Sequence, residues 1–212
     1  MDNYPGNTME SLLSIKKDEP CVRKCESDPL VVCYWFDNQI TLSHEVKNLK
    51  IPTSIHAAGR FVVTVEIIPG QHSSPIFLYN VTVNILEKIF SLTQMLSSKH
   101  DVITIYLWLR SWINSGAAIP VEIVADCSKA LLNALCKAFN NRYYATYLDD
   151  CLILLEKSDV APNQNKPPCL MKRDKNHTIK APTRWDEFHN NPVIKDFYLR
   201  IVGYGFEIRK LL

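Results

Sequence analysis

The stretch that decides the fold runs from Pro120 to Phe139 and reads PVEIVADCSKALLNALCKAF. Its first part, Val121–Ala125, is a short apolar run of strand-forming residues that follows a proline. Its second part repeats apolar residues at helical spacing, at Leu131, Leu132, Leu135, Ala138 and Phe139. The stretch therefore predicts a strand that runs into a helix, with Asp126 at the junction and Ser128 as the N-cap of the helix.

Asp126 has two interpretations that the spacing alone leaves open. An acid beyond the carboxyl end of a strand sits where α/β sheets commonly place ligands and metal ions. An aspartate just before a helix also often serves only to cap it.

Composition sets the outer bounds. The chain has 212 residues, of which 47% are hydrophobic and 22% charged, with a formal net charge of +2. This is the composition of a globular protein, and the charge is too small to argue for nucleic acid or a membrane surface. No apolar run is long enough to span a bilayer, and the start of the chain lacks the features of a secretory signal. Because seven cysteines are scattered without a disulfide pattern, we expect reduced thiols and a nuclear or cytoplasmic protein that is not secreted.

The first part of the chain predicts a polar leader followed by strands. Residues 1–27 lack a sustained apolar period and predict a flexible leader. Residues 30–36 and 40–42 favour one or two strands, and residues 43–50 a polar connector. Residues 51–83, with a Pro69-Gly70 turn, predict a three-stranded antiparallel meander.

The rest of the chain predicts mainly helices. One helix runs from Ser97-Ser98 to the Ser115-Gly116 stop, and its Trp108 and Trp112 are expected in the core rather than in a base-stacking platform. A second covers residues 143–156, with Asp149 and Asp150 on a solvated face rather than in a catalytic pair. A connector at 161–168, a short strand entering a polar segment at 169–177, and helices over 185–212 follow.

Three blocks then carry a resemblance to a known family. They are Ile55-His56-Ala57-Ala58-Gly59, the stretch from Pro120 to Phe139 with Asp126 and Ser128, and residues 169–185 with Arg173, Asp174, His177 and Arg184-Trp185. In order and rough spacing, the chain from residue 28 onward resembles the DDE-type transposases of the Mutator-like (MULE) group. The resemblance implies an α/β fold of the ribonuclease-H-like type, a mixed sheet with flanking helices, over residues 28–184, followed by the start of a helical insertion at 185–212.

The resemblance also implies a site, from which this chain departs. Such enzymes hold two divalent ions, Mg²⁺ or Mn²⁺, on three carboxylates to act on DNA phosphates. Asp126 matches the second acid, but His56 stands where the first acid is expected, and no residue matches the third. Asp174 and His177 are further candidate metal ligands. We therefore expect a transposon-derived, partial transposase domain that is inactive in DNA cleavage and holds no cofactor.

Two alternatives remain open. The first is a domesticated DNA-binding or protein-interaction module, whose candidate phosphate contacts are Lys172, Arg173, Lys180 and Arg184. DNA is then the expected partner, whereas a small-molecule substrate or a membrane is not expected. The second is a hydrolase that pairs a cysteine with His56 or His177, which lacks a recognisable nucleophile setting.

Overall fold

The computed structural model describes residues 14, 16, 19–61, 75–126, 128–156 and 167–174. The chain divides into two compact units, residues 1–172 and 173–212, and all the elements below belong to the first unit apart from the last residue of β7. The predicted insertion at 185–212 and most of the predicted connector at 161–168 lie outside the described residues. No helix in the described part is long and apolar enough to cross a membrane.

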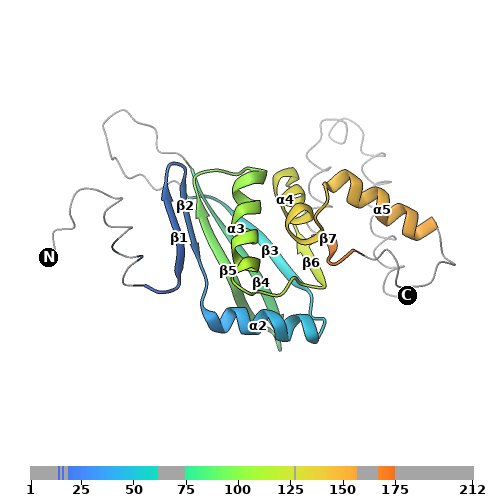
Figure 1. Cartoon of the computed structure of the whole chain (residues 1–212), viewed down its shortest axis with the longest axis horizontal. Coiled ribbons are helices and arrows are strands. Elements are labelled where there is room, and N and C mark those ends of the chain that lie inside the picture. The colour runs from blue at the N-terminus through green and yellow to red at the C-terminus, as the bar shows by residue number, and fades with distance from the viewer. Residues whose placement is uncertain are drawn as a thin grey trace, which may run out of the picture. The chain divides into compact units, whose positions relative to one another are not determined.

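Seven strands form one sheet in the described part of the chain (Figure 1). The strands are β1 (Val22–Ser27), β2 (Leu30–Tyr34), β3 (Thr53–Phe61), β4 (Ile76–Ile85), β5 (Lys88–Ser97), β6 (Glu122–Ala125) and β7 (Leu170–Arg173). Their order across the sheet is β1-β2-β5-β4-β3-β6-β7. The fold is therefore α/β with a mixed sheet, as the sequence predicts.

The pairing of neighbouring strands changes from antiparallel to parallel between β3 and β6. From β1 to β3, each strand is antiparallel to the next, whereas β3 and β6 run parallel and pair Thr53 with Ile123, Ser54 with Val124 and Ile55 with Ala125. Parallel neighbours need a crossover connection, and here it contains β4, β5 and a helix. The parallel pair brings the ends of β3 and β6 to the same edge of the sheet.

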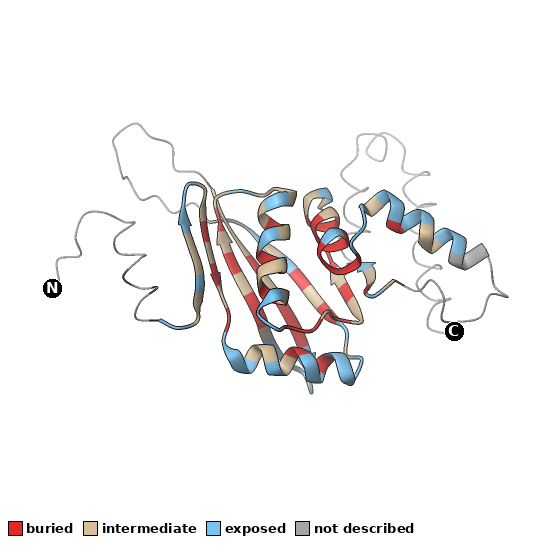
Figure 2. Ribbon diagram, viewed as in Figure 1, coloured by how far each residue is buried: buried red, intermediate tan, exposed pale blue. Residues whose placement is uncertain are grey.

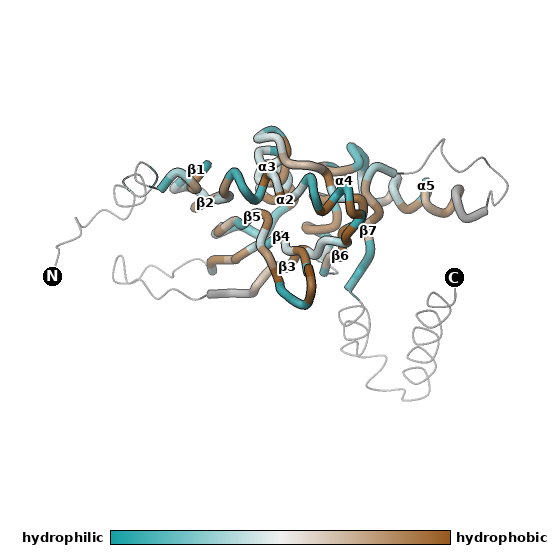
Figure 3. The backbone as a smooth tube through the Cα atoms, turned by 90° about the horizontal axis from the view of Figure 1, so that it is seen from below, coloured by the Kyte–Doolittle hydropathy of each residue, from teal (hydrophilic) through white to brown (hydrophobic). Residues whose placement is uncertain are grey.

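Four helices accompany the described strands, namely α2 (Asp37–Asn48), α3 (Val102–Asn114), α4 (Lys129–Asn140) and α5 (Tyr144–Glu156). The cap of α3 is Asp101, whose side chain accepts from Thr104 N, and the cap of α4 is Ser128, whose side chain accepts from Leu131 N. Helix α4 ends at Asn141, which has a left-handed φ of 52°. Helices α3 and α4 lie side by side over one face of the sheet (Figures 1 and 3).

The core lies between these two helices and the sheet (Figure 2). The prediction for the tryptophans is confirmed, because Trp108 and Trp112 of α3 are 1% and 0% exposed. Trp108 donates from Nε1 to Thr93 Oγ1 at 3.0 Å, so the polar atom of this buried ring is satisfied by β5.

Three local predictions are wrong. Residues 37–48 form α2 instead of a strand and a polar connector, and only Ser43 and Val46 of this helix are buried. Residues 22–27 form β1 rather than part of a leader. Strand β5 occupies residues 88–97, which the predicted meander does not include. The predicted Pro69-Gly70 turn lies outside the described residues.

The missed turn before β5 has a physical reason. Leu86 and Glu87 connect β4 to β5 with φ values of 50° and 63°. Such a two-residue turn is usually recognised by Asn or Gly, which adopt positive φ at little cost. With neither residue present, the sequence carries no turn signal here.

Candidate functional site

His56 and Asp126 are brought together by the parallel pairing of β3 and β6. Ile55 and Ala125 are register partners and are 0% and 1% exposed, so they anchor both strands in the core. His56 directly follows Ile55, and Asp126 directly follows Ala125. Because side chains alternate along a strand, His56 points away from the core face that Ile55 occupies.

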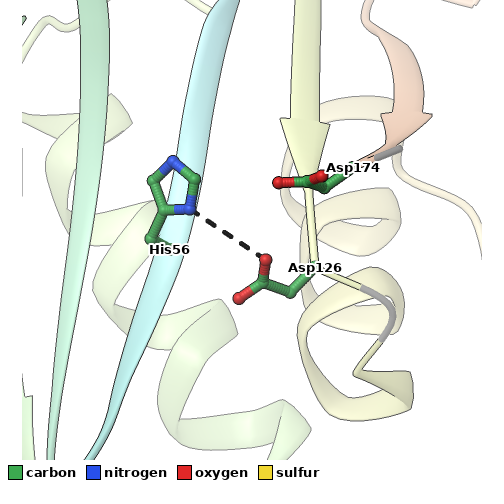
Figure 4. Close-up of side chains that lie close together, drawn as sticks. All are labelled: His56, Asp126 and Asp174. Atoms are coloured by element: carbon green, nitrogen blue, oxygen red, sulfur yellow. Dashed lines mark ion pairs between the residues drawn. The ribbon is translucent and has the colours of Figure 1, made fainter. Parts of the chain in front are cut away.

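The side chains of His56 and Asp126 point toward one another (Figure 4). His56 Nδ1 lies 4.0 Å from Asp126 Oδ1, and the side chains are 50% and 16% exposed. This distance is longer than that of a hydrogen bond. The two groups form an ion pair only when the imidazole is protonated. The carboxylate is therefore the better shielded partner, and the imidazole reaches it from the solvent side.

Asp174 is the third member of this group. It directly follows β7, and one potential ligand atom from each of His56, Asp126 and Asp174 lies within 4.8 Å of the other two (Figure 4). The set offers one imidazole nitrogen and two carboxylates. It does not fit a pair of Mg²⁺ ions, because Mg²⁺ prefers oxygen ligands and an imidazole supplies neither negative charge nor a bridge between ions.

The basic residues predicted to contact DNA are only partly described. Lys172 Nζ lies 2.8 Å from Glu122 Oε2, so its ammonium group is held by a carboxylate of β6. Arg173 is exposed at the end of β7. Lys180, Arg184 and the candidate ligand His177 lie outside the described residues.

Asp149, Asp150 and three buried thiols match their non-catalytic interpretations. Asp150 pairs with Arg142 at 2.9 Å and Asp149 is exposed, as expected for a solvated helix face. Burial raises the pKa of Cys33 and of Cys136 to about 12, and it also raises the pKa of Cys169. A raised pKa keeps a thiol protonated and disfavours its use as a nucleophile.

One residue near the site was not singled out by its sequence. His100 lies in the connector between β5 and α3, and its Nε2 is 2.8 Å from Ser128 Oγ, two residues beyond Asp126. Its neighbours Ser98, Lys99 and Asp101 are polar, as in many surface connectors, and no motif marks the histidine. Only the fold brings it to the start of α4.

Comparison with known proteins gives one strong similarity. No protein-family model matches the chain. The chain is 34% identical over 202 residues to the 120.7 kDa protein in the NOF-FB transposable element of Drosophila melanogaster. The aligned region covers 91% of this chain and 18% of that relative, so the chain spans less than a fifth of the relative's length. This similarity to a protein of a transposable element supports a transposon-derived origin for the chain.

Proposed function

We propose that the chain is a partial transposase domain of the MULE type, with a ribonuclease-H-like core that does not cleave DNA with magnesium. The observation that carries this proposal is the proximity of His56, within β3, to Asp126, which directly follows the parallel neighbouring strand β6. The similarity to a transposable-element protein supports it independently. The proposed substrate class is DNA, because transposition moves DNA, and the expected location is the nucleus or cytoplasm.

The order of elements supports the fold part of the proposal. Three antiparallel strands, β5, β4 and β3, are followed across the sheet by β6, which is parallel to β3, and then by β7. Asp126 directly follows β6, and His56 lies in β3. The family resemblance puts its first two acids at these two strands.

The candidate metal-ligand atoms support the proposed lack of DNA cleavage. In a magnesium-dependent phosphoryl transferase, carboxylates hold the ions that stabilise charge at phosphate. At His56 this chain offers a neutral or positively charged group in place of an anion. Beside Asp126, the histidine therefore lowers the attraction of the site for a hard divalent cation.

The test is the affinity of the chain for Mg²⁺, measured by titration calorimetry on the wild type, His56→Asp and His56→Asn. His56→Asp places a second carboxylate beside Asp126, and we expect it to tighten Mg²⁺ binding by on the order of tenfold or more. His56→Asn is the matched control, because it removes the imidazole and adds an oxygen without adding charge. Wild-type binding as tight as that of His56→Asp would overturn the proposal.

A further inference from the structure

His100 connects two parts of the fold that flank the candidate site. Its Nδ1 lies 2.6 Å from the hydroxyl oxygen of Tyr79 in β4, and its Nε2 lies 2.8 Å from Ser128 Oγ at the start of α4. A neutral imidazole has one donor and one acceptor nitrogen, so both contacts form together in either tautomer. The ring thus bridges a central strand and a helix cap.

The Tyr79 end of this bridge is fixed in the core. Tyr79 is 0% exposed, and its ring stacks on His100 with centroids 5.8 Å apart and an angle of 8°. The Tyr79 ring also contacts Trp108 of α3 at 6.1 Å. Tyr79 pairs across the sheet with Ala57, the neighbour of His56, so this anchor belongs to the strand next to β3. Burial raises the pKa of Tyr79, and the phenol therefore stays protonated at neutral pH.

The Ser128 end lies close to the candidate carboxylate. Ser128 caps α4 by accepting from Leu131 N at 3.4 Å, a long hydrogen bond that alone holds the cap only weakly. Strand β6 has four residues, and its pairing with β3 extends to Ala125. Strand β6 therefore ends just before Asp126, and the Ser128 cap of α4 lies two residues beyond this carboxylate.

We propose that His100 is a positioning residue that holds Asp126 opposite His56 by fixing the Ser128 cap to Tyr79. When the bridge is present, Ala125 is held in the sheet before Asp126, and Ser128 is held by His100 after it. Without it, the cap oxygen loses its shorter contact and keeps the long hydrogen bond from Leu131 N, and the carboxylate moves relative to β3. The proposal concerns the geometry of the site used in the proposed function, but it requires neither metal nor DNA.

The test uses the ring resonances of His56 as a reporter of the Asp126 carboxylate, in the full chain labelled at histidine with ¹⁵N and ¹³C. His56→Phe assigns the signal, and Asp126→Asn gives the displacement caused by loss of the charge. His100→Phe keeps the stacked ring and removes both hydrogen bonds. We expect it to move the His56 signal by at least about half of the Asp126→Asn displacement, because the field of a charge falls with distance.

Conservative variants separate positioning from general destabilisation. Ser128→Ala should reproduce the effect of His100→Phe, and Ser128→Thr, which keeps the hydroxyl, should restore the wild-type signal. The matched control is Asp101→Ala, which removes the cap of α3 next to His100 and should lower the melting temperature without moving the His56 signal.

An unchanged His56 signal in folded His100→Phe and Ser128→Ala would overturn the proposal, provided that Asp126→Asn moves it. If Asp126→Asn itself leaves the signal unchanged, the pairing of His56 with Asp126 is wrong, and both this proposal and the proposed function fail. If the His56 displacements are as expected but the wild type binds Mg²⁺ as tightly as His56→Asp, only the proposed function is overturned.

Discussion

Glu122 of β6 and Lys172 of the edge strand β7 form a salt bridge of 2.8 Å. The Glu122 side chain is 20% exposed and the Lys172 side chain 44%. The ammonium group of Lys172 is therefore bound by a carboxylate that is less exposed than the lysine itself. An ammonium group in this state must exchange a carboxylate for a phosphate before it can bind DNA. The salt bridge thus bears directly on the hypothesis of a DNA-binding module.

The first prediction concerns retention on immobilised double-stranded DNA as the salt concentration rises. Glu122→Gln frees Lys172, and we expect this variant to elute at higher salt than the wild type. Lys172→Ala combined with Arg173→Ala should elute at lower salt, because each lost phosphate contact reduces the salt dependence of binding.

The control is Lys47→Ala combined with Lys88→Ala, which removes the same charge from exposed positions on α2 and β5. Equal shifts in the two double variants would show that only net charge matters. That outcome would remove Lys172 and Arg173 as a DNA contact.

The second prediction concerns the hydrogen bond between Trp108 and Thr93. Trp108→Phe keeps an aromatic ring but leaves the Thr93 hydroxyl, which is 0% exposed, without its donor. We expect a loss of about 1–3 kcal/mol in the free energy of unfolding beyond the loss of ring volume, measured by urea denaturation.

Trp112→Phe is the matched control for this prediction. Trp112 is equally buried in the same helix, and its indole nitrogen has no hydrogen-bond partner in the described part of the chain. Its replacement removes the same volume without breaking a bond. If Trp108→Phe costs no more than Trp112→Phe, the hydrogen bond contributes nothing measurable.

The third prediction concerns the stability of the protein at alkaline pH. Burial raises the pKa of Cys33 and of Cys136 from about 9 to about 12. Between these values the unfolded chain loses a proton that the folded chain keeps, so the free energy of unfolding must fall as the pH rises. The slope approaches about 1.4 kcal/mol per pH unit for each such thiol.

Urea midpoints from pH 8 to pH 10 measure this slope. Cys33→Val and Cys136→Ala should each make it less steep. The same burial predicts slow reaction of these thiols with an electrophile at neutral pH. Rapid labelling of either residue in the folded protein would contradict the raised pKa and revive the hypothesis of a cysteine hydrolase.

The sequence predicts the elements whose local signals agree with their packing. The strand and helix on either side of Asp126 are confirmed with Ser128 as the cap, because an apolar run and a helical period meet there. Helix α5 and strand β7 lie where they are predicted. Helix α3 is also confirmed, but it begins at Val102 after the Asp101 cap and not at Ser97-Ser98, because Ser97 ends β5. In α4 the apolar residues of the pattern are also the ones that the fold buries, whereas Leu148 and Leu152 of α5 are exposed.

The misses are elements whose stability comes from distant contacts. Helix α2 is mostly polar, and it is held where Ser43 Oγ accepts from Ala118 N and where Gln39 donates to the backbone of β5. The bridge through His100 joins residues 21 and 28 positions away in the chain. Such contacts leave no period or motif in a single sequence, so no local pattern predicts them.

The last prediction is that the chain will not nick or join DNA with Mg²⁺ or Mn²⁺. Of the carboxylates that the family resemblance requires, Asp126 supplies the second, and His56 puts a nitrogen donor where the first should be. A Mg²⁺ ion held by few protein oxygens keeps most of its waters and stays mobile, so it cannot stabilise charge at one defined phosphate. Nicking of supercoiled plasmid should therefore equal that of Asp126→Ala, the matched control. Metal-dependent nicking by the wild type that is abolished by Asp126→Ala would refute this prediction. If Asp174→Ala also abolished this nicking, Asp174 would be identified as the carboxylate that completes a working site.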